Sequence, residues 1–496
     1  MRELSGLIAV VFLTWSGSGL AAQAGAEDTN LDGPVTLGDI VKVLQAQQQE
    51  LAEQRELIED QNRKIVRLRN EIDALNDDDP LRPAEQPVKA PAPAIVAMSG
   101  SEEEQEEEQK AEKKEETTEQ VEQAQRDDPA RDELRDFVGS VRLPGTRAAL
   151  RIGGFVKATT VNSFDPLEVT DRFIVGSIPV RDEDSAAEAE AAITADQSRL
   201  NFDLREPTDY GVLRAFIEGD FDGGDNGGQF RLRHAFGQWN RVLAGQTWSA
   251  FVDTDATPEE IDFEGLNGRV NVRQAQVRLF PKIGERYEFE LSAEDPNPLV
   301  DNGDGVTRFP DIVATARLNW GNRLHFKVGG LYRQVRANWD DAPRSTEKQT
   351  GWGLQVSGRF DAGWFDERDS ILFQVNGGKG IGRYINDLRS VGDFDGVFDA
   401  NGNLELIDVV SGYVSGQHWW GQTMRSNLTF GFVSLNNPGF VADDFYKKTF
   451  RISGNLMWSP TPRITLGGEL LWGQRENEDG AEGNASQVQF AARYNF

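Results

Sequence analysis

Arginine and acidic side chains are concentrated in one stretch of the chain, residues 229–268. Its first ten residues alternate with the period of a β-strand, and Arg231 and Arg233 fall on one face. The other face is apolar and carries Phe230, Leu232 and Phe236. A predicted loop at 250–268 then brings in six carboxylates, namely Asp253, Asp255, Glu259, Glu260, Asp262 and Glu264. Guanidinium groups bind carboxylates through paired hydrogen bonds, so this stretch predicts a charged constriction that attracts and orients anions.

Other arginines extend this cationic face. The same alternation points inward a set of side chains on neighbouring strands, namely Arg199, Arg205, Arg214 and Arg273. Arg278 returns to that face past a β-bulge after Gln274. Together with Arg231 and Arg233, these residues predict a pore wall that binds small anions opposite the acidic loop. An alternative is that the arginines only neutralise carboxylates of their own wall, which are Asp203, Glu218 and Asp220.

The strands that carry these side chains need an apolar phase on one side and water on the other, as in a membrane barrel. From Leu143 onward there are about 16 alternating segments. Long connections alternate with short ones, and the short ones carry Tyr210, Trp239, Trp320, Trp364, Trp420 and Trp458. Bacterial barrels show both this alternation and this girdle of aromatic residues. The predicted fold class is therefore all-β: a transmembrane antiparallel β-barrel of about 16 strands at residues 141–496.

The first 140 residues have a different composition. Residues 1–26 contain the apolar run and small residues of a signal peptide, the alternative being a short membrane anchor. Residues 27–76 carry apolar side chains every seven positions, beginning with Leu37 and Leu44. This repeat predicts an α-helical coiled coil, the alternative being a single helix packed on the barrel. Residues 77–140 are rich in Pro, Glu and Gln and predict a disordered linker. Because the first strand must start at the short-turn end, the coiled coil and linker are expected in the periplasm.

Two further features concern the outer membrane itself. The last segment, Gln487–Phe496, alternates and ends on an aromatic residue, which resembles the signal read by the outer-membrane assembly machinery. Acidic stretches that begin at Asp301 and Asp393 match no EF-hand spacing and predict ordinary turns. The alternative for these stretches is divalent bridging to lipopolysaccharide. Outer-membrane lipid is thus an expected partner of the outer face.

The composition excludes several kinds of function. The chain has 496 residues and a formal net charge of -30, which argues against nucleic acid as a partner. It has no cysteine, and its three histidines are His234, His325 and His418. They lack metal-ligand spacing and an evident nucleophile partner, and the parity of His234 with Leu232 points it outward. The sequence therefore predicts a protein that is not an enzyme, with no metal and no cofactor.

Several stretches resemble the DcaP-like outer-membrane porins. They are LPGTRAALRIGGFVKA from Leu143, SRLNFDLREPTDYGVLRAFIEGDF from Ser198, RLRHAFGQWNRVLAGQTWSAFVD from Arg231, IDFEGLNGRVNVRQAQVRL from Ile261 and GQHWWGQTMRSNLTFG near Trp420. The resemblance covers roughly residues 141–496, while the long predicted loop at 379–404 departs from it. It implies a homotrimeric channel for dicarboxylates and other small anions, and the coiled coil suits that family.

The expected function is therefore an outer-membrane porin that lets small anionic solutes such as dicarboxylates diffuse through a water-filled, Arg-lined channel. The alternative is a structural tether that links the outer membrane to the cell wall through the coiled coil, with a general non-selective pore. This alternative arises because the coiled coil and the linker have no obvious role in transport.

Overall fold

The computed structural model describes Leu134 and residues 137–496, except residues 168, 181–189, 225–226, 322–323 and 393. The predicted signal peptide (1–26), the coiled coil (27–76) and most of the linker (77–140) lie outside the described residues. The described end of the linker is packed, since Leu134 and Phe137 are buried against Ala149.

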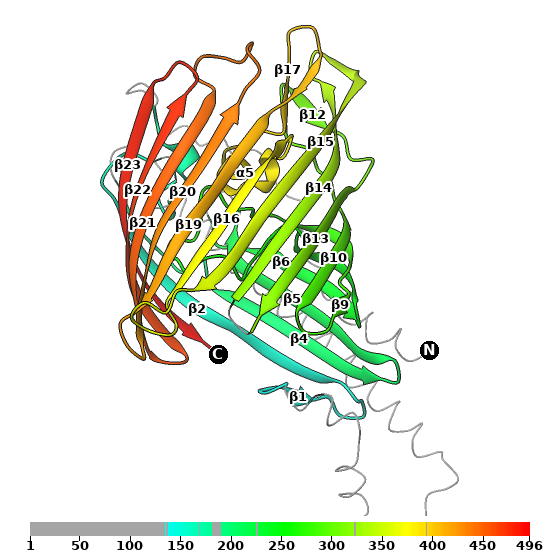
Figure 1. Cartoon of the computed structure of the whole chain (residues 1–496), viewed down its shortest axis with the longest axis vertical. Helices are drawn as coiled ribbons and strands as arrows, with labels where there is room; N and C mark the ends of the chain where they lie inside the picture. Colours follow the sequence, from blue (N-terminus) through cyan, green and yellow to red (C-terminus); the bar gives the residue numbers. More distant parts are fainter. Residues whose placement is uncertain are drawn as a thin grey trace, which may run out of the picture. The chain divides into compact units, whose positions relative to one another are not determined.

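Sixteen long strands form one closed antiparallel β-barrel (Figure 1). They are β2 (Ala149–Ser163), β4 (Arg199–Thr208), β5 (Gly211–Gly223), β6 (Gln229–Trp239), β7 (Val242–Trp248), β8 (Arg273–Leu279), β10 (Tyr287–Glu294), β13 (Asp311–Trp320), β14 (Leu324–Trp339), β15 (Ala342–Asp361), β16 (Ser370–Lys379), β19 (Asp408–Trp419), β20 (Met424–Asn436), β21 (Tyr446–Thr461), β22 (Ile464–Asn477) and β23 (Glu482–Asn495). The barrel closes where β23 pairs with β2, with Asn495 opposite Phe155 and Gln487 opposite Ser163. The predicted all-β fold class and the predicted number of strands are confirmed.

Shorter strands and helical turns lie outside the sixteen long strands. The short strands are β1 (Val141–Arg142), β3 (Ala191–Thr194), β9 (Lys282–Ile283), β11 (Val300–Asp301), β12 (Gly303–Gly305), β17 (Gly396–Phe398) and β18 (Leu404–Leu406). The helical turns are η1 (Val175–Ser177), η3 (Gly382–Tyr384) and α5 (Asn386–Val391). In the part of the chain that the structure describes, no helix has the length and apolarity to cross a membrane.

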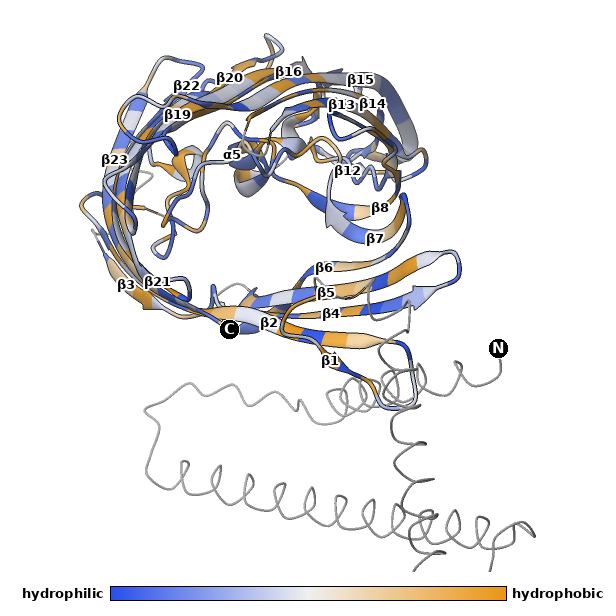
Figure 2. Ribbon diagram, turned by 60° about the horizontal axis from the view of Figure 1, so that its bottom comes forward, coloured by the Kyte–Doolittle hydropathy of each residue, from blue (hydrophilic) through white to orange (hydrophobic). Residues whose placement is uncertain are grey.

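Hydrophobic and hydrophilic residues alternate along many of the strands (Figure 2), as the period of two predicts. On β14, for example, Phe326 and Val328 are 39% and 41% exposed on the outer face, whereas Lys327 between them is 6% exposed on the inner face. The outer face is thus suited to lipid and the inner face to polar contacts.

Short turns gather at one end of the barrel and long connections at the other (Figure 1). All six aromatic residues predicted at the short turns are exposed. The connection at residues 337–349 is shorter than its polar sequence suggests, since β14 runs to Trp339 and β15 begins at Ala342. Most of that segment continues the two strands as a paired hairpin, because Ala337 and Asn338 still pair with Glu347 and Thr346.

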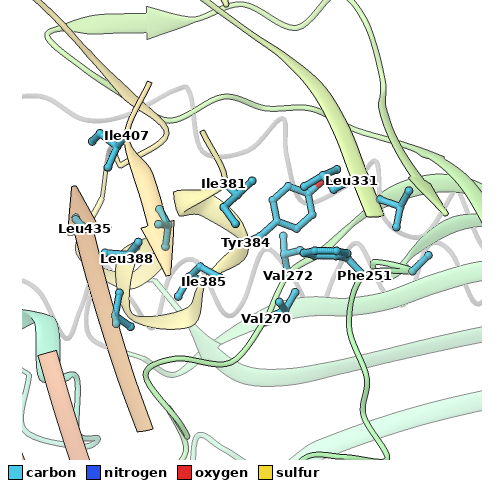
Figure 3. Close-up of a cluster of buried hydrophobic side chains, with 14 of the residues drawn as sticks. Phe251, Val270, Val272, Leu331, Ile381, Tyr384, Ile385, Leu388, Ile407 and Leu435 are labelled. Atoms are coloured by element: carbon cyan, nitrogen blue, oxygen red, sulfur yellow. The ribbon is translucent and has the colours of Figure 1, made fainter. Parts of the chain in front are cut away.

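Two long connections fold back inside the barrel (Figure 2). Residues 249–272, here called the inner loop, join β7 to β8, and residues 380–407, the bracing loop, join β16 to β19. Their apolar side chains meet in one buried cluster, to which the inner loop contributes Phe251, Val270 and Val272 and the bracing loop contributes Ile381, Tyr384, Ile385 and Leu388 (Figure 3). Burial of apolar surface in an otherwise polar interior holds the inner loop in place.

Candidate pore site

A register shift in β6 decides which side chains face the lumen. Glu218 of β5 lies opposite His234, whereas the next residue, Gly219, lies opposite Leu232. Arg233 is therefore an extra residue on β6, and such a bulge places two consecutive side chains on one face. The exposed fractions agree, since Leu232 is 42% exposed outside while Arg233 and His234 are 5% and 8% exposed.

The bulge overturns two predictions for β6. His234 was expected to point outward, but its Nδ1 forms a hydrogen bond of 2.9 Å with Thr247 Oγ1 and the ring is buried. Phe236 was expected on the outer face, but it lies opposite Phe216, and both rings lie beneath the inward guanidinium of Arg214. Both predictions are wrong because a period of two reverses its phase after an extra residue.

Arg231 and Arg233 are held by carboxylates of the neighbouring strand β5. Arg231 donates from Nε and Nη2 to the two carboxylate oxygens of Asp220, at 3.0 and 2.9 Å, and its Nη2 lies 2.8 Å from Asp222. Arg233 donates from Nη1 to Asp220 at 2.5 Å, and its Nε lies 3.6 Å from Glu218. The contacts of these two arginines therefore match the alternative in which acids of the same wall neutralise their charge.

The arginines of β4 and the start of β5 are paired in the same way. Arg205 and Arg214 each donate from Nη2 to Asp203 at 3.0 Å, and Asp203 is fully buried. The Arg199 guanidinium lies 3.6 Å from Glu218. All three point inward as predicted, but acids of the same wall offset their charge.

The two arginines of β8 do not share a face. β7 and β8 pair in continuous register from Arg273 opposite Trp248 to Leu279 opposite Val242, so the bulge predicted after Gln274 is absent there. Arg278 faces the lumen and its Nη1 lies 2.9 Å from Glu290. Arg273 has the opposite parity, and its guanidinium lies over the Trp248 ring at 4.8 Å. The predicted bulge is therefore wrong, because Arg273 and Arg278 differ in backbone parity along a regular strand. The charges of Arg233, Arg231 and Arg199 nevertheless act on the Arg273 guanidinium, so this group lies near the predicted arginine wall.

The six carboxylates of the inner loop contact the opposite side of the barrel and α5, not Arg231 and Arg233. Asp253 accepts hydrogen bonds from His325 Nε2 at 2.9 Å and from Ser357 Oγ at 2.6 Å. Four others contact arginines of β13, β20 and β21: Asp255 with Arg317 at 2.6 Å, Glu259 with Arg425, Glu260 with Arg451 at 3.4 Å, and Asp262 with Arg451 at 3.2 Å. Glu264 accepts a hydrogen bond from Ser390 Oγ of α5. The predicted arrangement of acids facing the arginine wall is wrong, because each acid has a nearer partner on the other side.

These contacts set the proton affinity of the loop acids. Burial acts to raise the pKa of Asp253, but the hydrogen bond from His325 and the charge of Lys327 outweigh it and hold that pKa below its ordinary value. Burial raises the pKa of Glu264 above its ordinary value, and the hydrogen bond from Ser390 only partly opposes this effect. Burial likewise raises the pKa of Glu260, against the charge of Arg451. Burial thus disfavours the charged forms of Glu260 and Glu264, whereas the contacts of Asp253 favour its charged form.

Phe263 is the side chain of the inner loop that reaches the cationic wall. Its ring centroid lies 5.7 and 5.8 Å from the guanidinium carbons of Arg231 and Arg233, 5.2 Å from that of Arg172 and 6.0 Å from Lys157 Nζ. Positive groups at this distance are attracted to the face of an aromatic ring. Sequence reasoning missed Phe263, and the available signal was weak: one aromatic residue between the acids Asp262 and Glu264.

A cavity of 760 Å³ lies between the inner loop and β2, β4 and β19–β23. It is lined by Phe263, by four cationic side chains, Lys157, Arg199, Arg425 and Arg493, and by three acids of the inner loop, Glu259, Glu260 and Asp262. Arg425 pairs with Glu259. Lys157 donates to the Ile261 carbonyl at 2.7 Å and Arg493 to Asn495 Oδ1 at 2.8 Å. Within residues 137–496 as described, neither of these two cations has a carboxylate within ion-pair distance, so no ion pair matches their positive charge. At longer range the charges of Asp262 and Glu469 act on Lys157, and those of Glu259 and Glu218 act on Arg493.

Buried polar contacts fix the bracing loop to the barrel. The Arg333 guanidinium is fully buried, 2.9 Å from Asp395 of the bracing loop and 3.3 Å from Asp311 of β13. Asp387 of α5 accepts hydrogen bonds from Tyr446 Oη at 2.7 Å and Thr449 Oγ1 at 2.8 Å. A loop anchored on both sides of the lumen keeps the inner loop from moving freely.

The acidic stretches form no metal site in the described part of the chain, where no three His, Cys, Asp or Glu side chains converge. The stretch at Asp301 forms a tight turn between β11 and β12, with Asn302 at φ 57°, as predicted. Residue 393 lies outside the described residues.

Known proteins with the same fold are outer-membrane channels. The sequence profile of the family described as DcaP outer membrane protein matches residues 148–496. The crystal structure of the outer membrane channel DcaP of Acinetobacter baumannii has a TM-score of 0.64 at 23% identity, over 72% of this chain and 100% of that chain. An anion-selective porin from Comamonas acidovorans (TM-score 0.48, 12% identity, 70% of this chain and 100% of that chain) and the trimer form of OmpT of Vibrio cholerae (0.47, 13%, 70% and 99%) are less similar. No curated protein sequence matches the chain significantly.

Proposed function

Since the chain belongs to the DcaP outer membrane protein family, we propose that its barrel is a porin through which small anionic solutes such as dicarboxylates diffuse. The proposed channel includes the cavity between the inner loop and β2, β4 and β19–β23. In this proposal the protein has no catalytic role, because the site offers charge and shape and needs no bond to form or break.

The observation that carries the proposal is the unmatched positive charge of Lys157 and Arg493 in the cavity. Arg231 and Arg233 are balanced by Asp220, Asp222 and Glu218, so they contribute little net charge. An anion that sheds part of its hydration near the two unmatched cations regains electrostatic stabilisation, whereas a cation is repelled. Because neither cation closes around the solute, binding stays weak enough for release.

The test is the reversal potential of the purified protein in a planar bilayer under a salt gradient. The double variant Lys157→Gln/Arg493→Gln should lower the preference for chloride over potassium and slow succinate flux. A control, Arg147→Gln/Lys447→Gln, removes the same charge from side chains that do not line the cavity. Equal reversal potentials for the wild type and the cavity variant would refute the assignment.

Further parts of the proposal concern assembly and orientation. We place the N-terminal region in the periplasm and the barrel in a homotrimer, in line with the family resemblance and the heptad repeat. A role as a tether to the cell wall has one specific observation in its favour: the Phe137 ring is clamped under the guanidinium groups of Arg151 and Arg205, at 5.1 and 4.1 Å. Deletion of residues 27–133 leaves this clamp intact; a channel then keeps its conductance, whereas loss of envelope integrity would reveal the tether.

A further inference from the structure

We propose that the cavity beneath the inner loop is a weak binding site for aryl carboxylates, in which Phe263 and Phe155 recognise the ring and Lys157 and Arg493 recruit the carboxylate. The inference rests on the proposed function, since such a solute must enter the channel as an anion. It goes beyond that function because it assigns a preference for a planar aromatic carbon skeleton.

Three aromatic residues from different parts of the chain line the same cavity, namely Phe155, Phe263 and Trp419. Phe155 comes from β2 and Phe263 from the inner loop, 108 residues later in the sequence. Phe155 is inward-facing and only partly buried, since the neighbouring Ile152 and Val156 are the exposed, outward residues of β2. The Trp419 ring is covered by the Arg368 and Arg425 guanidinium groups, at 4.2 and 5.3 Å. Phe155 and Phe263 therefore offer the cavity an apolar surface that a solute can contact.

Cationic groups accompany both rings. The Phe155 ring has the Arg493 guanidinium at 4.0 Å and the Arg199 guanidinium at 5.2 Å, while Lys157 Nζ lies 6.0 Å from the Phe263 ring. The cavity therefore presents a positive charge beside each apolar surface. An aryl carboxylate has the matching pattern, with a negative charge at one edge of a planar ring.

The acids of the inner loop form no ion pair with these cations, although the charge of Asp262 acts on Lys157 and that of Glu259 on Arg493. Glu259 is paired with Arg425, and Asp262 is held by Arg451 at 3.2 Å and by Gln489 Nε2 at 2.8 Å. In the described residues the Lys157 ammonium group donates to the Ile261 carbonyl. A solute carboxylate can therefore approach Lys157 and Arg493 without displacing an ion pair of the protein.

The cavity also has a suitable size and chemistry. Its 760 Å³ lies within the range of about 300–1,000 Å³ that is typical of small-molecule sites. Compact anions such as chloride or acetate gain only from the charges, whereas an aromatic ring also gains from offset or edge-to-face contact with Phe155 and Phe263. A saturated ring of similar size gains the apolar contact without the aromatic geometry. Benzoate should consequently reside longer than cyclohexanecarboxylate, and both longer than acetate.

The experiment measures how each of these three monoanions interrupts the chloride current through single channels of the full-length protein. The expected order of residence times is benzoate, cyclohexanecarboxylate, acetate. Phe263→Leu and Phe155→Leu keep an apolar side chain but remove the ring, and each should shorten benzoate residence roughly two- to tenfold relative to acetate. The matched control is Phe490→Leu, which makes the same change on the outer face, where Phe490 is 59% exposed.

The outcomes separate this proposal from the proposed function. Equal residence of benzoate and cyclohexanecarboxylate in the wild type, or Phe→Leu variants that leave the benzoate-to-acetate ratio unchanged, would overturn the aryl preference while chloride selectivity could still hold. A wild-type channel that prefers potassium over chloride would instead overturn the proposed function. If one variant fails to fold, the wild-type comparison of the three anions still decides the matter.

Discussion

Asp220 is the residue at which the charge balance of the arginine wall can be tested most directly. Its carboxylate is fully buried and accepts hydrogen bonds from both Arg231 and Arg233. Asp220→Asn removes one negative charge and keeps the size of the side chain, so the wall gains one net positive charge. The preference for anions should therefore rise, although the substituted residue itself never touches the solute.

The magnitude follows from the distance between the wall and the loop tip. The Arg231 and Arg233 guanidinium carbons lie 5.7 and 5.8 Å from the Phe263 ring, which is the part of the inner loop in contact with this wall. A unit charge at about 6 Å in a water-like lumen contributes about 0.7 kcal/mol, which screening at 0.1 M salt reduces to about 0.4 kcal/mol. Chloride and potassium respond with opposite signs, so their permeability ratio should change by about 0.8 kcal/mol, or about fourfold. Asp220 lies behind the arginines, which makes fourfold an upper limit.

The assay is again the reversal potential in a planar bilayer, measured at two salt concentrations because screening predicts a smaller shift at higher salt. Asp209→Asn is the matched control, since the Asp209 side chain is 87% exposed at a short turn and lies outside the cavity lining. A well-folded Asp220→Asn channel with normal conductance and an unchanged reversal potential would show that this wall does not set the field at the loop tip.

Three other predictions concern the loops and the barrel seam. Burial raises the pKa of Glu264, so in the folded protein this carboxyl group keeps its proton at pH values somewhat above 4.5, its ordinary pKa. Docking of the inner loop should therefore weaken as the pH rises from 4.5 through the raised pKa. Glu264→Gln should make the thermal midpoint of the detergent-solubilised protein less dependent on pH. Arg333→Met leaves the buried Asp311 and Asp395 without their shared cation and should cost about 3–5 kcal/mol of stability, seen as a lower urea midpoint, whereas Lys447→Met, at a side chain that is 37% exposed, should change it little. Deletion of Phe496, whose backbone N–H donates to the Gly154 carbonyl at 3.1 Å across the closing seam, should reduce the barrel yield in the outer membrane with export unchanged; a normal yield would contradict the assembly role.

The barrel could be predicted from the sequence because a membrane strand has a local signal. Each outward residue meets lipid and each inward residue meets water, so Phe326, Lys327 and Val328 reveal their faces by type alone. The same logic failed at Arg233, where one extra residue reverses the phase of β6 and no residue type announces it. Alternation therefore predicts strands well and bulges poorly.

The partners of the inner-loop acids could not be predicted, because they depend on which strands meet across the lumen. Asp253 and His325 are 72 residues apart in sequence, and Glu259 and Arg425 are 166 apart, yet each pair is in contact. A count of charges places acids and arginines in one stretch of sequence and suggests that they face each other. The fold instead gives Arg231 its partner on the adjacent strand, because neighbouring strands lie closer than any loop across a lumen.

The two sides of the lumen thus use the same residue types for different purposes. On the side of β13 to β22, Arg317, Arg425 and Arg451 each bind a carboxylate of the inner loop, and Glu469 accepts backbone N–H groups of the loop at 2.6 and 2.8 Å. These contacts hold the loop against that side, and the cavity beneath it is closed on the other side by β2 and β4. There the paired arginines are offset by acids of β5, and only cations without such partners, such as Lys157, leave a net field for a passing solute. The proposed anion preference therefore depends less on the number of arginines than on which cations the fold leaves without an ion-paired carboxylate.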